Sequence, residues 1–408
     1  MGRLAPCFRL CLCVCLCLCL APVVPALGLE AIQLTVWGPQ GDQDILAALI
    51  YEYKKERPDQ RFDITLQAVE EPDVWTRYKQ DSRAMADIFI FVGDRLMGFA
   101  EDGALLPVGR NRQGVIDANT PTSVESATVN GALYAYPLTE DNGYFLYYDN
   151  SVLTSEDVKT LDAILEKADA SGKKVYMDIA NGWYVASFFF GAGCRLYIDA
   201  AGRQNCDFNS DAGIEAGEAV RAFTASPSFL SGGDATLVSG IGEDICAGVS
   251  GIWNADAIRR KLGSKYSACK LPTYTLNGQQ AQMGSFIGTK LVGVSARTAH
   301  PREAEDMAAF LTGERAQILR FKVRAMRPSN IKAAAFQEVR DNIALIAFAD
   351  QKAYGVNQKF AKDAFWEPAK AFGEAMESHS QEDMGALLDE MVTAIQNNEQ
   401  YTADRDDE

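Results

Sequence analysis

The sequence predicts an α/β protein built from two lobes with a cleft between them. Its 408 residues are enough for two domains of ordinary size, and 48% are hydrophobic, so each lobe can bury its own core. Segments typical of strands alternate with segments typical of helices, and this alternation restarts after residue 150. Because no long linker or repeat interrupts it, we expect the chain to cross between the lobes several times.

The first lobe opens with a strand at 32–38, where apolar and polar residues alternate before a glycine. Residues 42–58 carry apolar side chains at helical spacing and stop at a proline, which predicts a helix. Strands follow at 62–69 and 86–93. The second of these is apolar almost throughout, as in a strand buried on both faces. The next helix is expected to end at Gly103.

The second lobe begins with a predicted amphipathic helix at 155–172, whose first turn contains Ser155 and Asp157. The alternation then continues, and the last 60 or so residues are mainly helical in pattern. We expect strands at 173–179, 245–253, 266–274 and 290–296, and helices at 182–193, 210–226, 254–263 and 301–323.

Residues 1–28 have the features of a secretory signal peptide. Arg3 and Arg9 precede an apolar stretch at 10–24, and small residues at 26–28 offer a cleavage point. The apolar stretch is too short to span a bilayer comfortably. Leu or Val precedes each of its cysteines, where a lipoprotein signal needs a small residue. The sequence therefore predicts an exported protein, periplasmic or extracellular, without a lipid anchor.

The formal net charge is −16. Nucleic-acid binding requires basic patches that neutralise phosphates, and binding to anionic lipid requires a basic surface. The charge therefore argues against both kinds of partner.

Four cysteines remain after the signal peptide, namely Cys194, Cys206, Cys246 and Cys269. An even number in an exported chain favours disulfides, and four cysteines allow three connectivities. We favour Cys194–Cys206, across a predicted hairpin, with Cys246–Cys269 joining two neighbouring strands. Four free buried thiols are the alternative. The chain has no CxxC motif, which disfavours a zinc site.

Catalytic motifs are scarce. The two histidines, His300 and His379, lie in polar surroundings, so a nucleophile activated by histidine is hard to build. Glu140 and Asp141 are adjacent, and in an extended chain their side chains point to opposite faces. They cannot by themselves flank one glycosidic bond. A carboxylate pair across the cleft, such as Glu70 with Asp141, stays open as an alternative.

Tryptophans gather where strands end. Trp37, Trp75, Trp183, Trp253 and Trp366 each lie near a strand end or in a loop. In open α/β sheets, ligands bind at the carboxyl ends of the strands. Indole faces beside polar side chains suit a sugar ring, which has an apolar face and a polar rim. For any one of these rings, a place in the core is the alternative.

Several motifs resemble one family closely. "NGALYAYP" followed by "YYDN", and "GIWNADAI", resemble the extracellular solute-binding proteins (family 1) of carbohydrate ABC transporters, in particular maltose/maltodextrin-binding proteins. The resemblance covers 30–395 and is carried by residues 91–108, 129–153, 248–258, 270–274, 285–311 and 364–369. It implies a type II periplasmic-binding-protein-like fold with hinge strands between the lobes. The N-terminal lobe would comprise 29–140 plus 288–331, and the C-terminal lobe 141–287 plus 332–408.

The resemblance also implies a set of ligand-binding residues. Phe91, Trp183, Trp253 and Trp366 stand at positions where the family stacks aromatic rings on sugars, and Asp94 with Arg95 matches a polar pair. The remaining candidates stand at or near positions of polar or aromatic contacts, with less regular matches: Gln40, Asp42, Gln43, Trp75, Glu140, Asp141, Asn142 and Asn181.

Residues 136–144 are predicted to cross between the lobes, with one of Glu140, Asp141 and Asn142 facing the ligand. Residues 145–150 are predicted to start the second lobe as a strand, so Phe145, Tyr147 and Tyr148 belong to its core.

The resemblance implies a monomeric binding protein without a cofactor. It would bind a maltose- or maltodextrin-type oligosaccharide and deliver it to the permease subunits of an ABC transporter. Two alternatives stay open: a binding protein for another solute, such as a different oligosaccharide, an oligopeptide or a polyamine, and an exported glycosidase.

Overall fold

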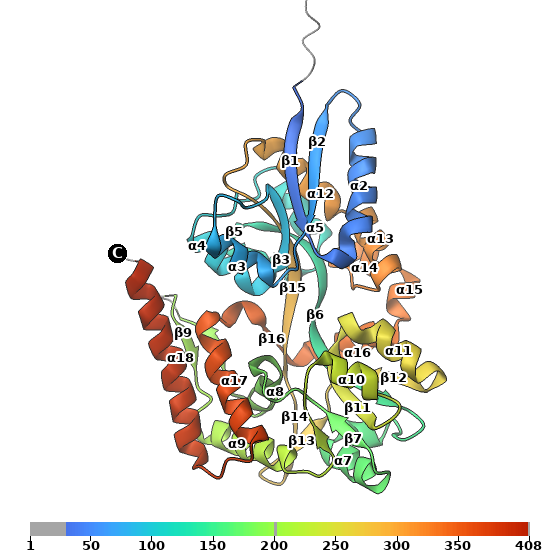
Figure 1. Ribbon diagram of the computed structural model, residues 1–408, viewed down its shortest axis with the longest axis vertical. Coiled ribbons are helices and arrows are strands. Elements are labelled where there is room, and N and C mark those ends of the chain that lie inside the picture. The colour runs from blue at the N-terminus through green and yellow to red at the C-terminus, as the bar shows by residue number, and fades with distance from the viewer. Residues whose placement is uncertain (1–29, 200–201, 407–408) are drawn as a thin grey trace, which may run out of the picture.

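The computed structural model describes residues 30–199 and 202–406. The predicted signal peptide, residues 1–28, lies outside these ranges. Figure 1 shows two lobes, one above the other, with two long strands running from the upper lobe into the lower one. No described helix combines the length and the hydropathy that crossing a bilayer requires.

One ten-stranded sheet runs through both lobes in the order β10-β7-β11-β6-β15-β3-β1-β2, with β12 beside β6 and β16 beside β15. The antiparallel pair β6 (Ala135–Asp149) and β15 (Ser285–Val294) lies at its centre. At about 3.3 Å per residue, β6 spans roughly 50 Å. Its first half pairs with β15 and its second half with β11 and β12, so this one strand belongs to both lobes.

In the N-terminal lobe β1, β2 and β3 are parallel, with α2 and α13 on one side and α3 and α4 on the other (Figure 1). Its elements are β1 (Ile32–Gly38), η1 (Gln40–Asp42), α2 (Gln43–Lys55), β2 (Phe62–Ala68), α3 (Asp73–Gln80), β3 (Ile88–Val92), η2 (Gly93–Arg95), α4 (Leu96–Glu101), α5 (Arg112–Ala118), α6 (Pro121–Ser126), β4 (Thr128–Val129), β5 (Ala132–Leu133), α12 (Pro301–Leu311) and α13 (Glu314–Arg324).

In the C-terminal lobe β7, β10 and β11 are parallel, and β11 and β12 flank β6. Its first elements are η3 (Asp157–Lys159), α7 (Leu161–Ala170), β7 (Lys174–Tyr176), α8 (Gly182–Gly191), β8 (Leu196–Ile198), β9 (Gln204–Cys206), α9 (Asp211–Thr224), β10 (Phe229–Leu230), α10 (Asp234–Gly240), β11 (Ile245–Gly251), η4 (Ile252–Asn254), α11 (Ala255–Leu262), η5 (Gly263–Lys265), β12 (Tyr266–Cys269), β13 (Thr273–Leu276) and β14 (Gln279–Gln282).

The chain returns to the lower lobe along its right side in Figure 1. The elements of this return are α14 (Ile331–Ala334), α15 (Gln337–Arg340), α16 (Ile343–Gln351), η6 (Lys352–Tyr354), β16 (Gly355–Asn357) and η7 (Gln358–Phe360). Two helices then complete the lobe, α17 (Asp363–Glu377) and α18 (Met384–Asp406).

Each lobe has its own apolar core. In the N-terminal lobe one cluster draws on β1, β3, the start of β6 and the end of β15. Two clusters lie in the C-terminal lobe, on the two faces of its part of the sheet. Phe145, Tyr147 and Tyr148 are buried in these clusters, which confirms their predicted place in the core. The lobe limits given above stay a proposal.

Some predicted elements differ in extent. The helix expected at 155–172 starts only after Thr160, whose hydroxyl accepts a hydrogen bond from the amide of Ala163 and caps α7. The long helix expected at 301–323 is two helices, because the chain turns at Thr312 and Gly313 between α12 and α13. The strand expected at 266–274 is broken into β12 and β13.

The predicted disulfides are wrong, because all four cysteines that the structure describes are free thiols. Cys246 and Cys269 are not on neighbouring strands: β6 lies between β11 and β12. Two strand spacings amount to roughly 9.5 Å, beyond the reach of a disulfide. Cys194 lies beside the Ser210 hydroxyl, 3.8 Å away, and is buried like Cys206. Free thiols, the alternative kept open above, are what the fold contains.

Candidate ligand-binding site

A small cavity of about 150 Å³ lies between the lobes, where the chain crosses from one to the other. The N-terminal lobe supplies residues from β15 and the end of α13, and the C-terminal lobe supplies residues from η4 and α11. The lining residues are Asp141, Ile252, Trp253, Ala255, Asp256, Lys290, Val323, Arg324, Ala325 and Met326.

Trp253 is the aromatic member of this cavity. It follows β11 directly in η4, and 39% of it is exposed. Its indole nitrogen donates to Asp234 Oδ2 over 2.9 Å, which fixes the ring orientation. Gly251 makes room for the ring, because a Cβ there would overlap it. Trp183, at the start of α8, lies beside it with ring centroids 5.6 Å apart and planes inclined by 38°.

A charge cluster stands at the hinge, and its member Lys290 lines the same cavity as Trp253. Lys290 Nζ lies 2.9 Å from Glu71 Oε1, and the register of β15 against β6 shifts around Thr289 and Lys290. Burial alone would lower the pKa of Lys290, but Glu71 and Asp141 outweigh it and raise the pKa above its ordinary value. Lys290 therefore stays cationic. No sequence motif pointed to Lys290 or Glu71, because they lie far apart in the chain.

Asp141 is 3% exposed and lines the cavity beside Lys290. Its Oδ1 accepts a hydrogen bond from the Thr139 hydroxyl over 2.7 Å, and its Oδ2 accepts one from the Arg327 amide over 3.1 Å. Burial raises the pKa of Asp141 against the opposing effect of Lys290. Of the two adjacent carboxylates, Asp141 is the one at the cavity.

Glu140 is 2% exposed and belongs to a separate ion-pair cluster. It pairs with Arg327 and with Lys352, the latter over 2.5 Å, and accepts a hydrogen bond from the Thr120 hydroxyl over 2.9 Å. Of the three residues of which one was expected to face the ligand, Glu140 is therefore held by ion pairs on both sides of the hinge. Glu140 ties the hinge strand to both lobes and is not among the residues that line the cavity.

The carboxylate of Asp42 is also held in ion pairs within the protein. It is 2% exposed and lies 2.7 Å from Arg320 Nε and 2.5 Å from Arg324 Nη1. Burial alone would raise the pKa of Asp42, but the two arginines hold it below its ordinary value. Both carboxylate oxygens are thus engaged by arginines, which the sequence-based assignment of Asp42 as a ligand contact did not foresee. Arg324 pairs with Asp42 and also lines the cavity.

Gln40 and Gln43 flank Asp42 in the turn that starts α2. The side chain of Gln43 donates to the Gly38 carbonyl over 2.8 Å, so it holds the turn together. The amide of Gln40 donates to Glu70 Oε1 over 2.9 Å, and its side chain is exposed. Of the three residues, Gln40 has the most open side chain.

The prediction that Phe91 stacks on a ligand is wrong. Its side chain is 0% exposed, in β3, and packs against Phe89 and Phe99 with ring centroids 5.5 and 5.2 Å away. All of its faces are covered within the core of the N-terminal lobe.

A second set of predicted residues meets residues 358–363 of the C-terminal lobe. Gln358 donates to Asp94 Oδ2 over 3.2 Å and accepts from Asn142 over 2.8 Å. Arg95 forms an ion pair with Asp363. Burial raises the pKa of Asp94 to about 6, although Arg95 opposes the shift. Asp94 Oδ1 is buried without a hydrogen-bond partner among the described residues.

Trp75 belongs to this set, and its indole nitrogen donates to Asp363 Oδ2 over 3.2 Å. Its ring stacks on Tyr78, with centroids 5.6 Å apart and planes inclined by 29°, and meets Phe99 edge-on. The polar edge of this ring, rather than a face, is turned to the other lobe.

Asn181 and Trp366 complete the predicted residues. Asn181 caps α8, since its side-chain oxygen accepts from the Trp183 amide over 3.0 Å. Trp366, in the first turns of α17, packs against Phe286 and Phe365. The indole nitrogens of Trp366 and Trp183 are buried without a partner in the described part of the chain. Two indole donors of the C-terminal lobe thus have no hydrogen-bond acceptor among the described residues.

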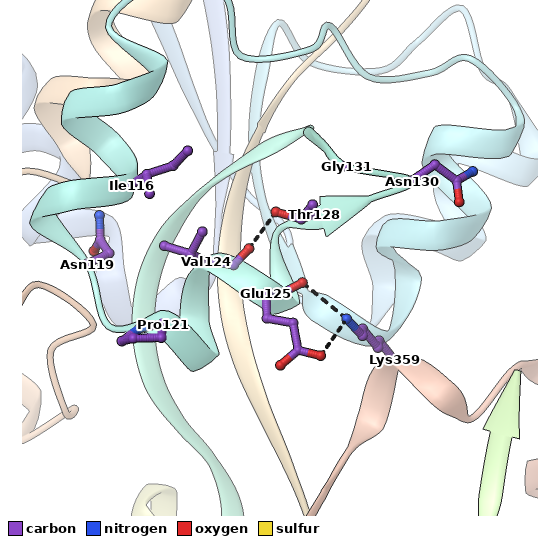
Figure 2. A pocket seen from close by; sticks show the side chains of 9 residues that line it. All are labelled: Ile116, Asn119, Pro121, Val124, Glu125, Thr128, Asn130, Gly131 and Lys359. Carbon is purple, nitrogen blue, oxygen red and sulfur yellow. Dashed lines mark hydrogen bonds and ion pairs between the residues drawn. The ribbon is translucent and has the colours of Figure 1, made fainter.

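A larger hollow of about 560 Å³ lies elsewhere, beside α5, α6 and the β4–β5 hairpin. Figure 2 shows the hydrogen bond from Lys359 to Glu125, two of the residues that line it. Its lining contains no aromatic ring and none of the predicted ligand residues. We therefore place the candidate site at the smaller cavity. Within the described ranges, no group of His, Cys, Asp and Glu is arranged to hold a metal ion.

Solved structures with the same fold cover nearly all of this chain. A protein solved with acarbose is 26% identical, with a TM-score of 0.81, over 90% of this chain and 99% of that one. The maltodextrin-binding protein of L. casei BL23, solved without ligand, is 22% identical with a TM-score of 0.79, over 90% and 99%. A cyclo/maltodextrin-binding protein complexed with maltotetraose is 20% identical with a TM-score of 0.76, over 90% and 97%.

A relative with an assigned function is the galactooligosaccharide-binding protein of Bacillus subtilis (strain 168). It is 26% identical over an alignment of 312 residues that covers 71% of each chain. Residues 48–347 match the family described as bacterial extracellular solute-binding protein. The match spans well over half of the chain and agrees with the two-lobed fold. This protein therefore belongs to the bacterial extracellular solute-binding proteins.

Proposed function

We propose that this protein binds a neutral oligosaccharide of the maltodextrin type between its lobes and delivers it to the permease of an ABC transporter. The observation that carries the proposal is the cavity at the hinge. There the partly exposed ring of Trp253 lines the same space as the polar groups of Asp141 and Lys290. A ring face with a few placed polar groups suits a sugar, which is apolar on its ring faces and polar at its rim.

A neutral ligand is favoured by the way charges are balanced. Lys290 is paired with Glu71, and Arg324 is paired with Asp42. Transferring an unpaired charge into such a site costs free energy, whereas hydroxyl groups can both donate to the carboxylates and accept from the cations. This disfavours a polyamine or an acidic peptide as the ligand.

Relatives support the choice of sugar. Their descriptions name acarbose, maltotetraose and galactooligosaccharide as ligands of those proteins. We choose the maltodextrin type over other oligosaccharides because several similar folds belong to maltodextrin binders. The same relatives are binding proteins, which favours binding over glycoside hydrolysis.

Entry of the ligand requires the lobes to separate. Pockets for drug-sized ligands usually measure about 300–1,000 Å³, and the cavity holds about 150 Å³. Hinge strands β6 and β15 can let the lobes open, and a ligand that contacts both lobes then favours closure. We further propose that the protein acts as a monomer, in the periplasm or outside the cell, without a lipid anchor.

A thermal-shift screen tests this function. The panel contains maltose, maltotriose, maltotetraose, a galactooligosaccharide, a neutral tripeptide and spermidine. We expect maltodextrins to raise the melting temperature most, since a ligand at 100 times its dissociation constant stabilises by about 2.7 kcal/mol. Stabilisation by the peptide or by spermidine alone would contradict the proposal. Chromatography of the sugars afterwards would reveal hydrolysis, the outcome expected of a glycosidase.

A further inference from the structure

Among the bonds that join the two lobes, three involve Gln358 and Asp363 of the C-terminal lobe, which we call the interlobe clamp. Gln358 bonds to Asp94, and Asp363 receives both Arg95 and Trp75 of the N-terminal lobe. Each oxygen of the Asp363 carboxylate takes one donor: Oδ1 takes Arg95, and Oδ2 takes the Trp75 indole nitrogen, 3.2 Å away.

We propose that Asp363 is an internal competitor of the ligand: it fills a subsite whose two donors, Arg95 and Trp75, would otherwise bind sugar hydroxyl oxygens. This proposal rests on the proposed function. It names Asp363 as a residue that sets affinity by occupying those donors while no ligand is bound.

Separation of the lobes acts on the bonds that Asp363 makes. The cavity is too small for an oligosaccharide, so the lobes must separate to admit one, and side-chain bonds between the two lobes are then stretched or broken. The bonds to Asp363 are of this kind, because Arg95 and Trp75 come from η2 and α3, whereas Asp363 starts α17.

Trp75 and Arg95 are suited to hold a ligand oxygen once Asp363 has left. The ring of Trp75 is held by Tyr78 and Phe99 of its own lobe, so its N–H stays directed at the cleft. Arg95 is anchored near Asp94, with Nε 3.6 Å from Oδ2. Two neighbouring hydroxyl groups on a pyranose ring offer two acceptor oxygens, much as the carboxylate does.

Exposure makes the contact easy to displace. The side chain of Asp363 is 56% exposed and that of Arg95 is 25% exposed. Ion pairs with this exposure are screened by solvent and contribute little to stability. A ligand can therefore replace Asp363, but must compete with it first.

The test is titration calorimetry with maltotriose on the full mature chain, using wild type, Asp363→Asn and Asp363→Ala. The matched control is Asp306→Ala, which removes a similar ion pair, to Arg110 at 3.1 Å, entirely within the N-terminal lobe. We expect both Asp363 variants to bind about three- to tenfold tighter than wild type, and the control to bind as wild type does. Equal or weaker binding by both Asp363 variants overturns the proposal.

Small-angle X-ray scattering without ligand separates this proposal from the proposed function. We expect a larger radius of gyration for Asp363→Ala than for wild type and for Asp306→Ala, because the lobes lose a bond that joins them. An unchanged radius overturns the competitor role. If wild type binds no sugar in the panel, the proposed function fails, and the scattering result alone decides whether Asp363 holds the lobes together.

Discussion

Asp94 is the residue whose ionisation should affect stability most visibly. Its pKa is raised to about 6 by burial, so the folded protein penalises the charged form. A carboxyl group whose folded pKa exceeds its unfolded pKa stabilises the protein increasingly as the pH falls through the folded value. Between pH 7 and pH 5 this one group should add about 1 kcal/mol to the free energy of unfolding.

Urea unfolding of wild type and Asp94→Asn at pH 5, 6 and 7 checks this prediction. The difference in unfolding free energy between the two proteins should change by that amount across the range. Asp141 and Asp178, whose pKa values are also raised, act alike in both proteins and cancel in the comparison. A difference that stays constant with pH would show that Asp94 is ionised normally in the folded state.

Single residues were predictable only where a local pattern decides their place. Trp253 follows a strand, and strand ends in α/β sheets meet at the ligand edge, so its position at the cavity could be expected. Phe91 lies at the other extreme. In an apolar run the sequence cannot tell a core residue from one that stacks on a ligand. Only the packing of Phe89 and Phe99 around Phe91 shows that it belongs to the core. Asp42 bonds to Arg320, which lies 278 positions further along the chain, so no local pattern could predict this pair.

The junction of β11 with η4 controls the platform made by Trp253. The backbone of Gly251 has φ −102°, which any residue adopts, so only the indole ring requires glycine there. We expect Gly251→Ala to displace the ring and weaken binding of maltotriose about tenfold, equivalent to about 1.4 kcal/mol. Calorimetric titration measures this change directly.

Gly233→Ala is the matched control for that substitution. Gly233 directly precedes α10, beside Asp234, and no described atom other than those of its chain neighbours lies within 4 Å of a Cβ placed there. It should bind as wild type does. Equal affinities for the Gly251 and Gly233 variants would mean that the position of the Trp253 ring does not matter to the ligand.

Whole elements were predicted better than their limits. The strands and helices of both lobes occur where periodicity placed them, because burial on one or two faces leaves a direct trace in the sequence. Periodicity did not predict where some helices begin and end. The cap at Thr160 makes α7 start later than expected, and the turn at Gly313 divides the helix expected at 301–323 into two. The sequence also did not predict that β6 is one continuous strand, since its first half pairs in one lobe and its second half in the other.

At the scale of the whole molecule, two lobes share two long strands and meet at a cavity that is too small for an oligosaccharide. Hinge closure around a ligand needs contacts that only the closed form can complete. Under the proposed function, the ring of Trp253 from one lobe and the Lys290 cluster from the other would provide such a pair, since Trp253 and Lys290 line one cavity. Sequence patterns could predict the lobes and their crossing, but not this pairing, because the three-dimensional fold creates it.

The most direct test of oligosaccharide binding between the lobes is calorimetric titration of maltotriose into wild type and Trp253→Ala. Tyr197→Ala serves as control, since Tyr197 is equally exposed, at 40%, and does not line the cavity. With aromatic stacking in other complexes as a guide, we expect Trp253→Ala to lose about 1–3 kcal/mol of binding free energy and Tyr197→Ala to lose none. Wild-type affinity in Trp253→Ala would contradict this expectation.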